Sequence, residues 1–506
     1  MRLIELGKGH ANLALLGLRF HAGRDLWPEG LLGVAALGEA LTEVASRQES
    51  LRTRFVELDG APGLAIDPPA PVPLPVADLS LLRPADRERQ LHRSAEHEAA
   101  RPFDLAAGPL FRVRLARLGG DVHTLFVSMH HVISDGWSLG VLIRELGELY
   151  GAALSGAPAA LPPLPVQYAD YALWQRRWLS GPVLGRHLDH WHERLAGLEP
   201  TVLPTDRAPR AGSGRPAGER PVALPAELVR GLHELAGRSG ATLFMVLLAG
   251  LELLLARYAG RRDVAVGTPV AGRSAAETEG LVGFFVNTLV LRGDLSGRPS
   301  FNELLARVRG DVLDAFAHQE APFAKVVERL RPEPGGQDED PLVRVVLALQ
   351  NAPAPPPALP GVEVIRLPVA APAAKFDLTL ELEEPAGEDG ELAGQATYRR
   401  DLFDSATVDR FLGHFHALLE AVVVSPELPV ADLPMLSPAE LRQLLLDWSG
   451  CSKAADASGA TAPGLFLATA SRQVRAIIEW YTIDRLSRCQ LKRPGRSAGL
   501  HHHWAR

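Results

Sequence analysis

The chain has 506 residues, of which 46% are hydrophobic and 22% charged, a balance typical of a folded globular protein long enough for two or more cores. A formal net charge of −7, without a basic stripe interleaved with aromatic residues, argues against nucleic acid as a partner. The longest apolar run, LFMVLLAGL at residues 243–251, reaches Glu252 too soon to span a bilayer, so we expect a buried helix and no membrane partner.

The cysteines and the N-terminal residues indicate the compartment. The only two cysteines, Cys451 and Cys489, lie near the end of the sequence, so no disulfide framework or thiol chemistry is expected before them. Residues 1–33 lack the order of charged, apolar and small residues found in a secretory signal. Together these features predict a cytoplasmic protein.

Hydrophobic periodicity divides the chain into predicted elements. Residues 1–33 show no clean periodicity, and we expect this N-terminal segment to lie outside the fold. The pattern then predicts helices at residues 34–45 and 85–100 and strands at 51–58, 110–118 and 125–132. After a stretch rich in Pro, Gly and Arg near residues 208–218, it predicts helices at 225–236, 241–258, 301–317 and 406–423 and strands at 263–270, 285–292, 376–384 and 392–398.

One predicted strand ends in two histidines and turns into a helix, with the sequence SMHHVISDGWS at residues 128–138. Side chains alternate along a strand, so His130 and His131 point to opposite faces and cannot act together. Asp135 and the glycine that follows it supply the turn, and Ser138 is expected to cap the helix. His131 is thus predicted at a strand end that faces a helix N-terminus, a place suited to polar chemistry.

An isolated string of this kind has a simpler interpretation, in which both histidines pack in the core and the aspartate only shapes a turn. A metal site is less favoured, because adjacent strand side chains diverge and no HExxH or CxxC motif completes a ligand set. No GxGxxG or Walker loop appears, and the elements lack the regular βαβ repeat of a doubly wound sheet. No bound metal, nucleotide or other bound cofactor is therefore predicted.

The whole string resembles the HHxxxDG core motif of nonribosomal peptide synthetase condensation domains. Five other segments agree with that family in order, although Gln48 stands where the family usually has histidine: RQESLRTRF at residues 47–55, YADYALWQ at 168–175, VGFFVNTLVLR at 282–292, AHQEAPF at 317–323 and PLVRVVLALQN at 341–351. The resemblance runs from about residue 34 to about residue 448. Six matches in order favour the family over the simpler interpretation.

The resemblance implies an α/β fold of the α+β type, with two chloramphenicol-acetyltransferase-like lobes in a V and a central substrate tunnel that passes His131. The N-terminal lobe is expected at residues 34–207, an inter-lobe hinge at 208–219 and the C-terminal lobe at 220–448. Residues 449–506 are expected to form an atypical basic tail, because residues 451–506 hold nine Lys and Arg against three Asp and Glu.

The resemblance also implies the formation of an amide by attack of an amine on a thioester. His131 is the candidate that orients or deprotonates the amine, and the N–H of Gly136 is the candidate donor to the thioester oxygen. Asp135 is expected to be structural and paired with an arginine, Arg273 as first candidate and Arg52 as second. The supporting residues expected around them are His130, Trp137 and Ser138.

The implied partners are donor and acceptor carrier domains, whose 4′-phosphopantetheine arms bring both substrates, and an adenylation domain. The strings SDGWS at residues 134–138 and KFDLTL at 375–380 resemble the branch of the family that takes L-configured donors. A coenzyme A-dependent acyltransferase is the nearest rival, since it uses the same HxxxD chemistry. Epimerisation and heterocyclisation fit the motif less well, and an inactive truncated remnant is the non-enzymatic alternative.

Overall fold

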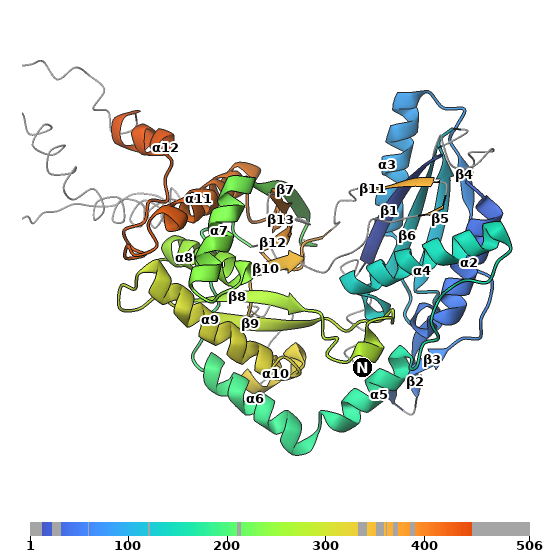
Figure 1. Cartoon of the computed structure of the whole chain (residues 1–506), viewed down its shortest axis with the longest axis horizontal. Helices are drawn as coiled ribbons and strands as arrows, with labels where there is room; N and C mark the ends of the chain where they lie inside the picture. The colour runs from blue at the N-terminus through green and yellow to red at the C-terminus, as the bar shows by residue number, and fades with distance from the viewer. Residues whose placement is uncertain are drawn as a thin grey trace, which may run out of the picture.

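The structure is a computed structural model, and it describes residues 13–22, 32–58, 60–119, 122–209, 214–331, 342–350, 359–360, 362–367, 373–384 and 390–447. These residues form two α/β lobes, each built on its own sheet, which meet in a V (Figure 1). The predicted fold class is thereby confirmed. The expected basic tail at residues 449–506 lies outside the described residues.

The first lobe is a five-stranded sheet with helices on both faces. In spatial order its strands are β11 (Val362–Leu367), β1 (Leu13–Ala22), β6 (Val122–His130), β5 (Phe111–Arg117) and β4 (Val76–Asp78). One core is shared by the sheet, α2 (Val34–Arg47) and α4 (Gly136–Ser155), and a smaller cluster on the other face includes α3 (Pro84–Ala100). A separate hairpin joins β2 (Thr53–Leu58) to β3 (Ala61–Ile66).

Strand β1 corrects the expectation that residues 1–33 lie outside the fold. It pairs antiparallel with β6, with Leu13 opposite His130, and from Gly17 onward it also pairs with β11. Leu18 and Phe20 are each 1% exposed and belong to the first lobe's core. A strand paired on both edges and covered on both faces reads as a nearly continuous apolar run, so periodicity alone did not reveal it.

The second lobe holds a six-stranded sheet. Its strands in spatial order are β7 (Ala217–Leu224), β13 (Leu392–Arg399), β12 (Leu378–Glu383), β10 (Val345–Gln350), β8 (Asp263–Val270) and β9 (Asn287–Asp294). Its helices are α7 (Ala226–Arg238), α8 (Leu243–Ala259), α9 (Phe301–Ala317), α10 (Phe323–Leu330) and α11 (Ser405–Val424), followed by the short α12 (Pro438–Arg442).

Helix α8 is apolar around most of its circumference and is buried, as predicted for residues 243–251. Among the described helices none is by itself long and apolar enough to cross a membrane. Helices α7 and α8 satisfy that test only as a pair, which is bent by 102°.

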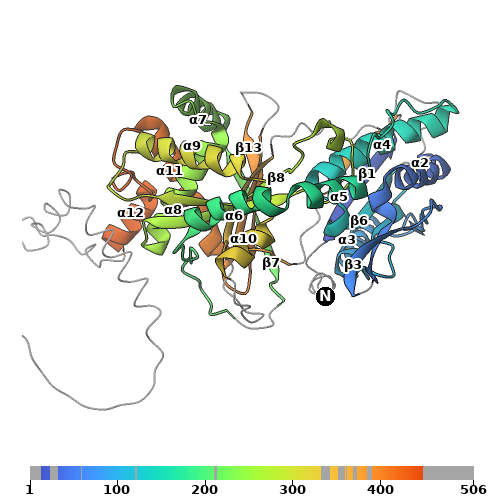
Figure 2. The same cartoon turned by 90° about the horizontal axis from the view of Figure 1, so that it is seen from below.

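The lobes exchange segments, which corrects the predicted boundaries. Strand β11 follows the second-lobe strand β10 in sequence but pairs with β1 in the first lobe. Within the predicted first lobe, Trp191 and Leu195 of α6 (Gly181–Leu195) pack in the core of the second lobe. The polypeptide therefore passes from one lobe to the other through α5 (Tyr168–Trp178) and α6, well before the hinge expected at 208–219 (Figures 1 and 2).

Candidate functional site

The HHxxxDG string occupies the junction between β6 and α4. Strand β6 ends at His130, and His131 begins a short 3-10 turn over His131–Ile133. The strand predicted at 125–132 therefore extended two residues too far at its C-terminal end and began three residues late. Helix α4 begins at Gly136 and its N-cap is Asp135, not Ser138 as predicted. An Asp135 oxygen accepts the Ser138 N–H at 2.8 Å, which satisfies one of the free donors of the first helical turn.

His131 is held in one tautomer by its own turn. Its Nδ1 lies 3.2 Å from the Ser134 carbonyl oxygen. A carbonyl can only accept, so this contact requires a proton on Nδ1 and leaves the lone pair on Nε2. Burial, followed by the positive charge of Lys375, lowers the pKa of His131 to about 4. The ring is therefore neutral near pH 7 and can act as a hydrogen-bond acceptor.

His130 is placed differently and has a different role. It is 5% exposed, its Nδ1 accepts the Val132 N–H at 3.1 Å, and its ring meets that of Phe103 edge to face at a centroid distance of 5.9 Å. Burial and then Lys375 lower its pKa to about 4. The Nδ1 lone pair is thus already used to hold the turn that carries His131.

Asp135 pairs with Arg273, the first of the two predicted candidates. The Arg273 guanidinium lies 3.2 Å from an Asp135 oxygen, and the side chains are 1% and 5% exposed. The other Asp135 oxygen accepts the Phe285 N–H at 3.0 Å, and the guanidinium stacks 3.9 Å from the centre of the Phe285 ring. Asp135 therefore joins the helix of one lobe to residues of the other.

Arg52 does not take part in this ion pair. Its guanidinium lies 3.3 Å from Glu49, and it donates a hydrogen bond at 2.5 Å to the backbone oxygen of Asp67 beside the β2–β3 hairpin. These contacts keep Arg52 within the first lobe. The role expected for it as a second candidate partner of Asp135 is therefore wrong.

The remaining supporting residues of the string contact residues 271–286, which connect β8 to β9 and are called the bridging loop below. Trp137 donates its Nε1–H to the Glu279 carbonyl at 2.9 Å. The Ser138 hydroxyl donates to the Gly283 carbonyl at 2.8 Å and accepts the Gly283 N–H at 3.0 Å. Trp137 and Ser138 therefore hold the bridging loop of the second lobe against the start of α4.

Gln48, which stands at the position where the family usually has histidine, binds the same loop. It is 1% exposed; its amide nitrogen donates to the Gly280 carbonyl at 3.0 Å, and its amide oxygen accepts the Val282 N–H at 2.9 Å. The amide nitrogen also lies 3.1 Å from buried Glu145. One amide thus satisfies buried polar groups from both lobes, and Val282 packs in the first lobe's core.

Gly136 is open on its side-chain side. As the first residue of α4, its N–H has no preceding helical turn to accept it. A methyl group built on its α-carbon would meet no atom of the described residues within 4 Å, apart from its chain neighbours and the backbone of α4 itself. The backbone here can therefore be approached closely by another molecule, as an oxygen-binding role requires.

Two second-lobe residues near His131 were not predicted as site residues. The exposed Lys375 influences the pKa of both histidines, and the Phe284 ring lies 6.4 Å from that of His131. The Tyr168 hydroxyl donates to the Phe284 carbonyl at 2.8 Å. Both residues lie in segments that the sequence singled out, but nothing in those segments indicates that they face His131.

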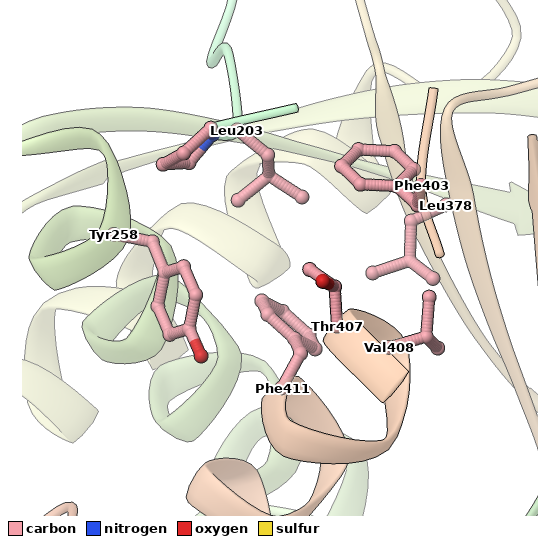
Figure 3. A pocket seen from close by; sticks show the side chains of 8 residues that line it. Leu203, Tyr258, Leu378, Phe403, Thr407, Val408 and Phe411 are labelled. Atoms are coloured by element: carbon pink, nitrogen blue, oxygen red, sulfur yellow. The ribbon is translucent and has the colours of Figure 1, made fainter. Parts of the chain in front are cut away.

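A small hollow in the second lobe lies apart from these residues. Its volume is about 20 Å³, enough for about one water molecule, and no residue of the HHxxxDG string lines it. Figure 3 shows its mostly apolar lining, formed by Leu203, Pro204, Tyr258, Leu378, Phe403, Thr407, Val408 and Phe411. The hollow is thus not the candidate site, and the predicted tunnel past His131 stays a prediction.

Comparison with known proteins gives consistent matches. The sequence model of the Condensation domain family matches residues 28–445. A linear gramicidin synthase from Brevibacillus parabrevis is 42% identical over 427 residues, which cover 84% of this chain and 5% of that protein. Phosphinothricin tripeptide synthetase PhsB from Streptomyces viridochromogenes is 41% identical over 83% of this chain and 35% of that protein. Among solved structures, the X-domain from teicoplanin biosynthesis has 31% identity and a TM-score of 0.77, covering 86% of this chain and 95% of that one.

Proposed function

The chain belongs to the condensation-domain family, and from this premise we propose that it forms an amide bond between two carrier-bound substrates. It spans only 5% and 35% of the two synthetases compared above, so the activity of those whole proteins is not carried over. The observation that supports the proposal most is the neutral His131 ring, with Nδ1 bound to Ser134 and Nε2 left as an acceptor, next to the open N-terminus of α4.

In the proposed reaction the amine nitrogen of the acceptor attacks the carbonyl carbon of the donor thioester. The new carbon–nitrogen bond forms, the carbon–sulfur bond breaks, and the proton lost by the amine ends on the released thiol. The chemistry needs an oriented amine, a donor to the oxygen that gains negative charge, and the exclusion of water.

His131 is better suited to orient the amine than to remove its proton. An α-ammonium group in a peptide has a pKa of about 8, whereas the pKa of His131 is lowered to about 4. A base that weak cannot hold the proton of an ammonium group. A neutral Nε2 can still accept a hydrogen bond from the neutral amine and direct its lone pair to the carbonyl carbon.

Gly136 supplies the donor to the oxygen that gains negative charge. Its N–H lies at the positive end of the α4 dipole, and nothing in the described residues crowds its side-chain side. An oxyanion there would receive a fixed backbone donor that needs no reorganisation during the reaction. Asp135 and Arg273 keep this N-terminus in place and are positioning residues.

The partners in this proposal are a donor and an acceptor carrier domain with 4′-phosphopantetheine arms, together with an adenylation domain. We propose an L-configured aminoacyl or peptidyl donor and a cytoplasmic location, as the sequence predicts. Preference for a donor with a D-configured terminal residue in a competition assay would contradict the first of these.

A second candidate function is that of a docking module without catalysis. The X-domain from teicoplanin biosynthesis, in a solved complex with OxyB, is 30% identical to this chain with a TM-score of 0.75. That similarity makes recruitment of another enzyme a reasonable alternative. The free Nε2 of His131 and the exposed backbone of Gly136 at the start of α4 support catalysis, since docking requires neither.

Single-turnover condensation with loaded carrier domains separates the two candidates. We expect His131→Ala to abolish amide formation while circular dichroism and melting stay close to wild type, because the ring is only partly buried at the start of the 3-10 turn. His97→Ala, an exposed histidine of α3, is the matched control and should retain activity. A folded His131→Ala protein that still makes the amide would overturn the role of His131. A wild-type protein with no activity toward any loaded pair would favour docking.

A further inference from the structure

Four ionisable side chains gather between α6 and α9, on the side of the second lobe that carries the connection between lobes. His187 and His190 are three residues apart on α6, and Asp314 and His318 are four apart at the end of α9, so each pair lies on one helix face. Figure 2 shows α6 running between α9 and α10. The mechanism uses none of these residues.

Three of the four converge on one point. One ligand atom each from His190, Asp314 and His318 lies within 4.8 Å of the other two. The His190 Nε2 and an Asp314 oxygen are 3.5 Å apart. Two nitrogens bound to one zinc ion at about 2.1 Å each lie roughly 3.4 Å apart in tetrahedral geometry. A contraction of at most about 1.4 Å would therefore bring all three atoms onto one ion.

His187 forms a hydrogen bond with the His318 ring. The Nδ1 atoms of the two rings are 3.2 Å apart, a hydrogen bond in which one nitrogen carries the proton and the other the lone pair. If His318 donates, its second ring nitrogen is a free acceptor. Histidines that bind metals commonly donate their other N–H to a neighbouring group in this way.

Burial and neighbouring charges act on two of these rings. Burial, and then the neighbouring His318, lower the pKa of both His187 and His190. Arg194 is close enough to lower that of His190 further, but Asp311 neutralises its charge at 2.6 Å.

We propose that His190, Asp314 and His318 bind a divalent transition-metal ion of the zinc class, with His187 orienting His318. Two imidazoles and a carboxylate suit zinc, cobalt or nickel better than the hard cations magnesium and calcium. In the structure the His190 and His318 rings are stacked at 3.8 Å and are nearly parallel. Binding turns the partly exposed His190 ring out of this stack, and solvent completes the coordination.

The ion would reinforce contacts that already join α6 to the end of α9. Arg194 pairs with Asp311, and Trp191 donates its Nε1–H to the His318 carbonyl at 3.0 Å. Because α6 follows α5 in the connection between lobes, an ion here fixes one end of that connection to the second lobe. The proposal does not depend on the amide-forming activity.

The test is calorimetric titration of the chelator-treated full chain with zinc chloride, together with the zinc-dependent shift of the melting temperature. Metal binding by the tail is removed first, in a background with His501→Ala, His502→Ala, His503→Ala, Cys451→Ser and Cys489→Ser. Cobalt chloride is the spectroscopic probe, because its visible absorption reports nitrogen and oxygen ligands.

In that background we expect one zinc ion per chain and a raised melting temperature. His190→Gln combined with His318→Gln should abolish both, and His187→Gln should weaken zinc binding by roughly 10- to 100-fold. His192→Gln, an exposed neighbour on α6, is the matched control and should change neither. Absence of zinc binding in the background, or binding that survives the double substitution, would overturn the site.

Discussion

Arg273 of the second lobe lies 3.2 Å from Asp135 of the first lobe, and neither side chain is more than 5% exposed. Asp135 is also the N-cap of α4. Its carboxylate therefore caps this helix and also pairs with the buried guanidinium of Arg273, which lies 138 residues further along the sequence. The geometry around His131 therefore depends on how the two lobes are docked. Changes at the lobe contact should affect the site even when they leave His131 untouched.

Replacement of Asp135 by alanine should destabilise the protein by roughly 3–5 kcal/mol, because Arg273 would remain buried without its counter-charge. Urea unfolding measures this loss. The matched control is Asp78→Ala, which removes a surface pair with Arg117 at 3.6 Å, both side chains about half exposed. That pair should contribute no more than about 1 kcal/mol. Equal effects of the two substitutions would contradict a buried pair at Asp135.

Stability should fall on mild acidification because of His130 and His131. Both pKa values are lowered from 6.5 to about 4, so the unfolded chain binds protons that the folded protein does not bind between these limits. Their contribution to stability is complete above pH 6.5 and is lost as the pH falls toward about 4. Urea unfolding at a series of pH values measures the slope. The double substitution His130→Gln and His131→Gln should flatten it, and an unchanged slope would show that other groups are responsible.

Alanine at Gly136 should leave folding intact and slow amide formation. The added methyl meets no side chain of the described residues within 4 Å, and it would occupy the space that the proposed reaction leaves for substrate. Gly272 is the contrasting position: its φ is +62°, and a methyl there would lie 2.1 Å from the Phe285 carbonyl oxygen. Gly272→Ala should therefore lower the melting temperature. Melting curves and single-turnover rates of both variants are the measurements, and a fully active Gly136→Ala protein would argue against close approach of substrate at α4.

Loss of the Gln48 amide should loosen the contact between the lobes. Gln48→Ala leaves the Gly280 carbonyl and the Val282 N–H without this hydrogen-bond partner, at a cost of roughly 1–3 kcal/mol. Limited proteolysis should then cut the bridging loop sooner than in wild type. Gln90→Ala, on the exposed side of α3, is the control. A bridging loop that is cut equally fast in Gln48→Ala and wild type would contradict the anchoring role.

Strand β1 should be essential to the first lobe. Leu18 is 1% exposed between β6 and the helices, so Leu18→Ala should cost roughly 2–5 kcal/mol through the cavity that it leaves. Leu81, which is 97% exposed, is the matched control and should change stability little when replaced by alanine. Chemical denaturation compares the two, and a negligible effect of Leu18→Ala would mean that β1 is not part of the stable core.

Most elements of the fold were predictable from local pattern. The helix at residues 301–317 was predicted to the residue, and the strand at 263–270 likewise, because apolar periodicity and flanking polar residues act over a few neighbours. Among the elements that the pattern did not predict are β1 and β11. The first has no alternation to detect, and the second lies in sequence among second-lobe strands but completes the first-lobe sheet, which no local signal encodes.

The sequence by itself determined the family, the HHxxxDG string and the candidate catalytic residues. Each of these is recognised from the types of residues that stand close together in the sequence. Only the tertiary structure decided that Asp135 pairs with Arg273 and not Arg52, that Asp135 and not Ser138 caps α4, and that Gln48 holds the bridging loop. These contacts join residues more than a hundred positions apart, or depend on how a single turn closes. Their free energies come from burial and hydrogen bonding that exist only once the two lobes have docked.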